Sequence, residues 1–373
     1  MSPRTWKITL ACGALLLVMA VTVFSYLRAA SVLLASIKAQ DPTGLTKLVE
    51  APVKTRDVEL VSRGEHIAAR IYQPSRKEPL AAVLLVHGIH PRGIDEPRFV
   101  SFAMAMARVG NVVMTPSLPE LASLEATPST IARIAAAASA LCAESKRDVI
   151  VIGISVGGGL SLLAAARQHG QTPIARVVTV GAHDNLVRIA QHYAGITATD
   201  ISGRKSTIKP HPYGIQVMIY AHADHVFNAE DFPIARKALA LYLSEHYREA
   251  VREARKLSQE GQALMNAVFR DPTGPIVAAR LRDAIEQVQG ALHAVSPDGK
   301  LNSLQIPVML LHGQTDPVIP ATELSWLEHE IPRGLVEAAL VTPVLTHADF
   351  PEGVGTLDYL RILHFASQML DPP

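Results

Sequence analysis

Residues 148–159, DVIVIGISVGGG, form an apolar run that leads through closely spaced glycines into a segment rich in alanine and leucine. Ser155 lies at the turn, with Gly153 and Gly157 two positions to either side. A strand that turns so sharply into a helix leaves no room for Cβ atoms beside the serine. The stretch therefore predicts a buried strand, a tight turn and a helix, with Ser155 projecting near the positive end of that helix.

Short apolar runs extend this pattern on both sides of the turn, with helix-length segments between them. They predict strands at residues 82–86, 112–115, 149–154, 177–180, 307–311 and 336–341. Upstream, two runs joined by a turn at residues 63–65 predict a hairpin at residues 58–61 and 66–72. Strands that are apolar throughout indicate a parallel sheet with helices on both faces. The predicted fold class is α/β, with a doubly wound and mostly parallel sheet.

The alternation stops at residue 184 and resumes at residue 305, which predicts an insertion between two strands. Within it, helix-start signals occupy residues 228–233, and an apolar face at helical spacing runs from Leu239 to Ala254. The predicted divisions are a core at residues 55–184 and 305–373, a helical cap at residues 185–304, and hinges near residues 183–185 and 296–299.

An uncharged apolar run, ITLACGALLLVMAVTVFSYL, occupies residues 8–27 between basic residues. As a helix it would be about 30 Å long, which matches the hydrocarbon core of a bilayer. A cleaved signal peptide usually has a shorter apolar region that ends at small residues, whereas this run ends at a tyrosine and a leucine. We expect residues 1–28 to form an uncleaved transmembrane helix, and residues 29–54 to form a short helix and a tether.

The distribution of charge bears on location and partners. Arg4, Lys7 and the terminal amine precede the apolar run, whereas Arg28 and Lys38 follow it. The slight excess of positive charge before the run favours an N-terminus inside the cytoplasm and the remaining chain outside it. The 373 residues include 35 basic and 34 acidic side chains, for a formal net charge of +1. This balance argues against a nucleic-acid partner and against an acidic substrate attracted by a strong field.

A serine hydroxyl at its ordinary pKa is a poor nucleophile, so Ser155 needs a base that a third group orients. Asp316 lies in LLHGQTDPVIP, residues 310–320, directly after the first predicted strand that follows the insertion. His347 lies in TPVLTHADF, residues 342–350, just past the next strand. Both are placed where strand ends converge on Ser155. We predict Ser155 as nucleophile, His347 as general base and Asp316 as the orienting acid.

Other polar residues near these loops leave alternatives open. Asp349 and Asp184 are alternative acids for the predicted base. His312 lies beside the acid loop, and we expect it to pack rather than to act in catalysis. His183 adjoins Asp184 at the end of a predicted strand and is placed to border the pocket.

Two pairs of histidines raise the question of a metal. His87 and His90, like His222 and His225, lie three positions apart. A zinc site needs three or four ligands, and no third ligand is evident near either pair. The chain has two cysteines, which form no cluster, and no glycine loop followed by Lys-Ser/Thr for a phosphate. We therefore expect neither a metal nor a cofactor.

With these motifs, residues 55–370 resemble the α/β-hydrolase superfamily, in which Gly-x-Ser-x-Gly forms a turn called the nucleophile elbow. Residues 87–90, HGIH, resemble the family's oxyanion loop, although they lack the three consecutive glycines of some lipases and esterases. The resemblance implies an oxyanion hole formed by the backbone N–H groups of Ile89 and Val156.

The resemblance also implies hydrolysis by acyl transfer, with cleavage of a carboxylic ester through an acyl-enzyme on Ser155 as the favoured reaction. A thioesterase or a peptidase would use the same three residues. A membrane-tethered binding protein on a hydrolase scaffold is the alternative from a different class. The anchor and the apolar cap favour a small-molecule acyl substrate that is hydrophobic or lipid-like.

Overall fold

The computed structural model describes residues 3–38, 44–75, 78–167, 173–347 and 349–371, with side chains from residue 19 onward. Within these residues an eight-stranded sheet has the order β1-β2-β4-β3-β5-β6-β7-β8. The strands are β1 (Val53–Ser62), β2 (Glu65–Pro74), β3 (Ala82–Val86), β4 (Val112–Pro116), β5 (Val149–Ile154), β6 (Ile174–Val180), β7 (Val308–Gly313) and β8 (Val336–Thr342). β2 pairs antiparallel with β1 and with β4, and the other neighbours pair parallel.

The mostly parallel sheet confirms the predicted fold class, and each predicted strand is present. The central strands are apolar throughout because both of their faces are covered: every residue of β3 and of β4 is buried. Alternate residues of β3 contribute to two separate apolar clusters, with Leu84 in one and Val83 and Leu85 in the other. This division follows from the twofold alternation of side chains along a strand.

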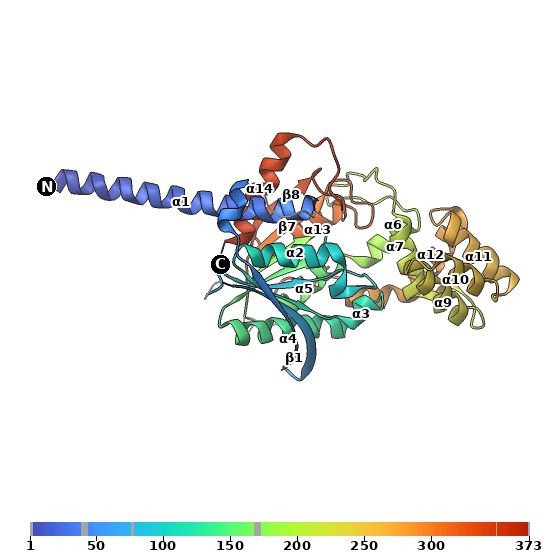
Figure 1. The fold of residues 1–373 in the computed structure, drawn as a ribbon. Coiled ribbons are helices and arrows are strands. Elements are labelled where there is room, and N and C mark those ends of the chain that lie inside the picture. Colours follow the sequence, from blue (N-terminus) through green and yellow to red (C-terminus); the bar gives the residue numbers. More distant parts are fainter. Residues whose placement is uncertain (1–2, 39–43, 76–77, 168–172, 348, 372–373) are drawn as a thin grey trace.

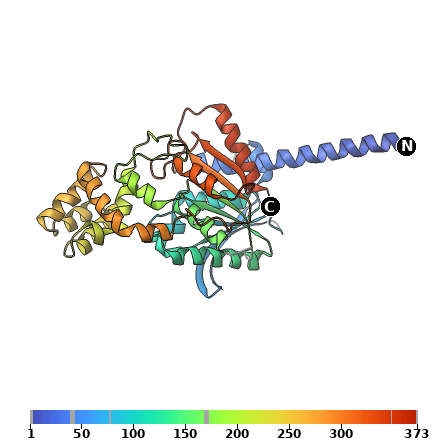
Figure 2. The ribbon, with the colours of Figure 1, turned by 180° about the vertical axis from the view of Figure 1, so that it is seen from behind.

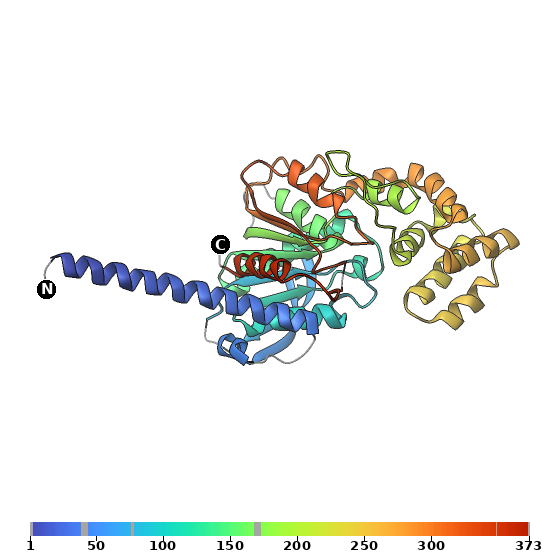
Figure 3. The ribbon, with the colours of Figure 1, turned by 90° about the horizontal axis from the view of Figure 1, so that it is seen from above.

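Helices form a layer on each face of the sheet (Figure 1, Figure 3). On one face lie α2 (Pro97–Arg108), α14 (Thr356–Leu370) and the last part of α1 (Pro3–Lys38). The other face is covered by α4 (Pro128–Ser145), α5 (Val156–Ala166) and α13 (Thr322–Glu330). Short helices occupy the connections: η1 (Gly44–Val49), η2 (Gly93–Asp95) and α3 (Pro119–Ala122).

The insertion between β6 and β7 is helical and projects from one end of the molecule (Figure 1, Figure 2). Its helices are α6 (Leu186–Tyr193), α7 (Pro212–Ala221), α8 (Ala223–Val226), α9 (Phe232–Leu243), α10 (Tyr247–Ala254), α11 (Gln259–Arg270) and α12 (Pro275–Ala294). The apolar face predicted from Leu239 to Ala254 is divided between two helices. The chain turns at Glu245, whose φ is +66°, and Tyr247 beyond the turn is 53% exposed.

At the N-terminal end, α1 does not stop at Arg28, where the sequence pattern ends the anchor. It continues to Lys38, so the short helix predicted after the anchor is part of the same helix, and its residues 29–38 dock on the body. The reason is visible at Arg28, which is 2% exposed and donates hydrogen bonds to the carbonyl oxygens of Val109 and Leu370. A charged residue that marks the end of an apolar run in the sequence is here a buried anchoring side chain.

One helical segment is long and apolar enough to cross a membrane, judged by length and composition among the residues whose side chains are described. That segment is Met19–Ile37, and 28% of it is buried inside the protein. The predicted span at residues 8–27 overlaps it only from Met19 onward. The side chains of residues 3–18 lie outside the described part of the chain, as do residues 1–2.

Candidate active site

Ser155 connects β5 to α5 in a strained backbone conformation, with φ +56° and ψ −132°. The neighbouring glycines make this turn possible. A Cβ atom at Gly153 would lie 2.6 Å from the carbonyl oxygen of Gly157, and one at Gly157 would lie 2.4 Å from the carbonyl oxygen of His87. Strain of this kind is typical of residues held in place for function. The turn directs Ser155 toward the carboxyl end of the sheet, at the first residue before α5.

Asp316 and His347 come from the loops that follow β7 and β8, and the structure brings them together. The Nδ1 atom of His347 donates to Oδ2 of Asp316 at 2.8 Å. The other carboxylate oxygen accepts the backbone N–H groups of Val318 at 2.8 Å and Ile319 at 2.9 Å. With Nδ1 as the donor, the Nε2 atom of the imidazole ring is left to act as a base.

The carboxyl group of Asp316 is buried, which by itself would raise its pKa. Hydrogen bonds from His312 and His347 outweigh burial and hold the pKa well below its ordinary value. The Nε2 atom of His312 lies 3.5 Å from Asp316 Oδ2 and donates to the carbonyl oxygen of Ile319 at 2.9 Å. His312, predicted only to pack, therefore also contacts the acid and braces its loop.

Ser155 and His347 line the same cavity, together with Ile89 and Val156. The hydrogen bonds of the described residues do not include a direct bond between Ser155 Oγ and the His347 ring. Catalytic hydrogen bonds are often long in a substrate-free site and tighten when the substrate binds. The two side chains thus share one cavity but are not in contact through a hydrogen bond in this state.

The loop between β3 and η2 passes close to the serine. A Cβ atom at Gly88 would lie 2.9 Å from Cβ of Ser155. The Tyr213 hydroxyl, which comes from α7 of the cap, donates to the carbonyl oxygen of Ile89 at 3.3 Å. Tyr213 therefore ties the cap to the residue whose N–H is predicted to face the oxyanion. No local sequence signal marks this tyrosine, because its partner lies far away along the chain.

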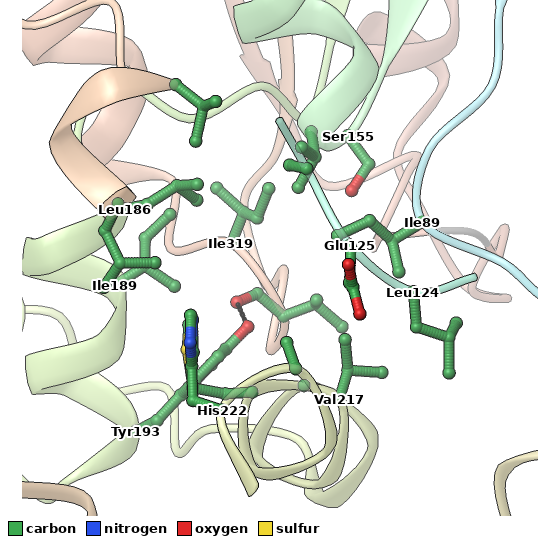
Figure 4. Close-up of a pocket in the computed structure, with 18 of the residues that line it drawn as sticks. Ile89, Leu124, Glu125, Ser155, Leu186, Ile189, Tyr193, Val217, His222 and Ile319 are labelled. Carbon is green, nitrogen blue, oxygen red and sulfur yellow. Dashed lines mark hydrogen bonds between the residues drawn. The ribbon is translucent and has the colours of Figure 1, made fainter. Parts of the chain in front are cut away.

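The cavity has a volume of about 370 Å³ and lies between the core and the cap (Figure 4). Its walls are mostly apolar side chains: Ile89, Leu124, Leu186, Ile189, Val217, Met218, Leu292, Val295, Val318 and Ile319. Polar groups also line it, including an ion pair that joins Glu125 of the core to Arg236 of the cap. An apolar cavity with a few polar groups is the usual form of a small-molecule site.

The two alternative acids make other contacts. Asp184 pairs with Arg188 at 2.8 Å, and burial raises its pKa from 3.8 to about 7 despite that ion pair. Asp349 is exposed and pairs with Arg98 at 3.3 Å. In the structure the carboxylate that contacts His347 is that of Asp316.

The histidine pairs do not assemble a metal site. The Nδ1 atom of His87 donates to the carbonyl oxygen of Gly88 at 2.8 Å, and burial lowers the pKa of its ring. Within the part of the chain that the structure describes, no group of three His, Cys, Asp or Glu side chains could hold a metal ion. His183 is fully buried at the base of the cap, where its Nε2 atom donates to the carbonyl oxygen of Val295.

A serine on a strand-to-helix turn, facing a His–Asp pair from later strand ends, is the arrangement of an enzyme of the hydrolase class. The family model described as "alpha/beta hydrolase fold" matches residues 127–343. The chain therefore belongs to the α/β-hydrolase family, as its motifs predicted.

Several solved structures are similar to this chain at low sequence identity. An esterase from Pyrobaculum calidifontis is 18% identical, with a TM-score of 0.45 over 94% of this chain and 89% of that one. Carboxyl esterase 2 from Tuber melanosporum is 14% identical, with a TM-score of 0.46 over 86% of this chain and 88% of that one. The 2-hydroxy-6-oxo-6-phenylhexa-2,4-dienoate hydrolase from Rhodococcus sp. strain RHA1 is 15% identical, with a TM-score of 0.45 over 85% of this chain and 99% of that one. No curated protein matches the sequence.

Proposed function

We propose that this protein is a serine hydrolase that cleaves a carboxylic ester through an acyl-enzyme on Ser155. The observation that carries the proposal is the 2.8 Å hydrogen bond between His347 Nδ1 and Asp316, on a histidine that lines the same cavity as Ser155. The strained turn at Ser155 supports it, because the backbone holds the hydroxyl in place at the cavity before any substrate arrives.

In the proposed reaction, Ser155 Oγ attacks the ester carbonyl while His347 Nε2 removes its proton. The carboxylate of Asp316 orients the imidazole and stabilises its charged form. The N–H groups of Ile89 and Val156 stabilise the oxyanion, each by about 3–4 kcal/mol in sites of this kind. The tetrahedral intermediate then expels the alcohol, which takes the proton from His347.

The second half of the reaction repeats this chemistry with water. His347 removes a proton from a water molecule, which attacks the acyl carbonyl on Ser155 and releases the carboxylic acid. The apolar walls of the cavity favour a hydrophobic acyl group, since burying such a group releases water from apolar surface. A thioester or a peptide bond could be cleaved by the same steps.

Labelling with a fluorophosphonate probe tests whether Ser155 is an activated nucleophile. We expect the full-length protein in detergent to be labelled, and Ser155→Ala and His347→Ala to lose the label. Ser161→Ala is a matched control, because Ser161 lies on α5 and donates only to the carbonyl oxygen of Gly157. Labelling that persists in Ser155→Ala would refute the assignment of the nucleophile.

A panel of substrates with a common acyl group then separates the alternatives. Oxygen ester, thioester and amide forms are compared by kcat/KM, and the proposal expects the oxygen ester to be preferred. Preference for the thioester or the amide would favour the thioesterase or the peptidase. No labelling and no turnover would favour a binding protein on a hydrolase scaffold.

We also propose that the first part of α1 anchors the protein in a membrane through residues 8–27. Support comes from the apolar composition of this segment and from its position. Figure 1 shows that α1 extends well beyond the body of the protein before its last part docks against α2 and α14. A helix of apolar composition that extends beyond the body is suited to the hydrocarbon core of a bilayer.

A further inference from the structure

The docked part of α1 holds the helix firmly against the body. Ser25 donates to the Asp371 carboxylate at 2.7 Å, and the Tyr26 hydroxyl lies 2.7 Å from His364 Nδ1. Arg28 donates to Asn111 Oδ1 at 3.0 Å, in addition to its bonds to two backbone carbonyls. These contacts join the helix to separate segments of the chain, so its direction relative to the sheet is set by the fold.

The projecting part of α1 is only about as long as a bilayer's hydrocarbon core is thick, so the body must lie close to the membrane surface. Residues 8–24 are the part of the proposed span that precedes the docked segment, and as a helix they extend about 26 Å at 1.5 Å per residue. The hydrocarbon core of a bilayer is about 30 Å thick. A helix that crosses the membrane with these residues therefore brings the body directly against the lipid headgroups.

The surface beside the point where α1 leaves the body carries two exposed leucines. The 3₁₀ helix η1 packs against α1, and Figures 1 and 3 both place it next to this exit. Its side chains Leu45 and Leu48 are 69% and 73% exposed. Exposed leucines next to a transmembrane helix are suited to the boundary between headgroups and acyl chains.

The cavity lies at the other end of the molecule. Ser155 follows the carboxyl end of β5, and the cap helices that close the cavity lie still further from the N-terminal helix (Figure 1, Figure 2). The docked residues 25–38 alone extend about 21 Å along the body in that direction. The cavity and the exit of α1 are thus separated by about the length of the strands in the sheet.

We infer that α1 and η1 fix the enzyme upright on the bilayer, with the cavity facing the aqueous phase, so that its substrates are dissolved esters and not lipids resident in the same membrane. This inference rests on the proposed ester hydrolysis and on the proposed anchor. The anchor locates the enzyme, and the substrate reaches the cap from the water side. The hydrophobic acyl group expected from the cavity walls is then one short enough to dissolve.

Two fluorophosphonate probes test the orientation of the cavity without knowledge of the natural substrate. One carries a water-soluble tag, and the other carries two long alkyl chains that keep it in phosphatidylcholine vesicles. In detergent, where both probes mix freely with the protein, both should label Ser155. In vesicles that contain the full-length protein, we expect the soluble probe to react as before and the lipid probe to react at least tenfold more slowly.

Insertions after Phe24 provide the matched pair of variants. A flexible glycine-serine insert lets the body turn toward the bilayer and should restore labelling by the lipid probe. A helix-forming insert of the same length keeps the direction of α1 and should not. Equal labelling of the unmodified protein by the lipid probe in vesicles and in detergent would overturn the inference. Failure of both probes in detergent would refute the proposed function instead.

The proposed contact between η1 and the bilayer can be tested separately. An environment-sensitive dye on Leu48→Cys, in a chain whose two cysteines are replaced by serine, should report an apolar surrounding when the protein is in vesicles. The control is Val61→Cys, because Val61 is 69% exposed but lies on the hairpin of β1 and β2. A dye at position 48 that remains in water would refute the contact between η1 and the bilayer.

Discussion

The shape of the site requires glycine at position 157, because any side chain there would collide with the backbone. A Cβ there would meet the carbonyl oxygen of His87 at 2.4 Å, and neither backbone segment can move without disturbing Ser155 or Ile89. Similar crowding surrounds Gly153. These two glycines let the serine turn pack directly beneath the loop that is proposed to hold the oxyanion.

We expect Gly157→Ala to lower the stability of the protein by about 1–3 kcal/mol through overpacking and to abolish fluorophosphonate labelling. Gly290→Ala on α12 is the control, because nothing lies within 4 Å of the added Cβ and alanine favours a helix by about 1 kcal/mol over glycine. Urea unfolding and labelling measure both effects. A Gly157→Ala variant with normal labelling would contradict the proposed geometry of the turn.

The acid can be tested without changing the size of a side chain. Asp316→Asn keeps the shape but removes the charge that stabilises the protonated His347 ring. In comparable triads such a change lowers kcat by roughly 10⁴-fold. Asp349→Asn should leave kcat unchanged, because Asp349 is exposed and contacts Arg98. Ester turnover by the two variants shows whether Asp316 or Asp349 is the acid that orients His347.

At the scale of elements, the join between core and cap is a buried charged cluster. The Asp184 N–H donates to Glu323, and the carboxylates of Asp184 and Glu323 both accept from Arg188. The Asp298 N–H donates to the Asp184 carbonyl oxygen, so the two segments that enter and leave the cap lie side by side. This cluster holds the base of the cap near the cavity.

The stability of the protein should depend on the ionisation of Asp184. Burial raises the pKa of this carboxyl from 3.8 to about 7, with the charges of Glu323 and Asp298 acting in the same direction against Arg188. The folded state therefore binds the proton more tightly than the unfolded chain does. Stability that is present below pH 4 is lost as the pH rises from about 4 to about 7.

Asp184→Asn should remove this loss, so urea unfolding of the variant should depend less on pH between pH 4 and 7 than that of the wild type. Asp349→Asn, on the exposed surface, should keep the wild-type dependence. Parallel stability curves for Asp184→Asn and the wild type would show that the carboxyl is already ionised across this range.

The docking of α1 on the body depends on the hydrogen bonds that Arg28 donates. Arg28→Ala leaves Asn111 and two carbonyl groups without their donor in a buried site, and we expect a loss of about 2–4 kcal/mol. Arg92→Ala is the control, because Arg92 is exposed. Thermal unfolding of full-length protein in detergent measures the difference, and equal stability of the two variants would argue against a docked α1.

At the scale of the whole molecule, the projecting part of α1, which is proposed to cross a membrane, and the helical insertion lie at opposite ends of the protein (Figure 3). If α1 crosses a membrane as proposed, the charges that flank the apolar run predict which side carries the body. The residues before the run, Arg4 and Lys7, predict that the body lies outside the cytoplasm.

A membrane-impermeant fluorophosphonate probe should therefore label Ser155 in intact cells as well as in broken cells. Labelling confined to broken cells would place the body in the cytoplasm. Ser155→Ala provides the background in both preparations. The result also decides which aqueous compartment supplies the substrate.

The sequence alone determined the sheet, the turn at Ser155 and the chain order of serine, aspartate and histidine. These features are local: apolar strands, close glycines and loop residues directly after strands can each be recognised within about a dozen residues. Only the tertiary structure decided which carboxylate meets His347, because Asp184, Asp316 and Asp349 all adjoin strand ends and differ in distant neighbours. The roles of His312, Tyr213 and Arg28 likewise depend on contacts between remote segments. The burial of Arg28 shows the reason, since a charge that reads as the end of an apolar helix becomes interior once another part of the chain supplies its hydrogen-bond acceptors.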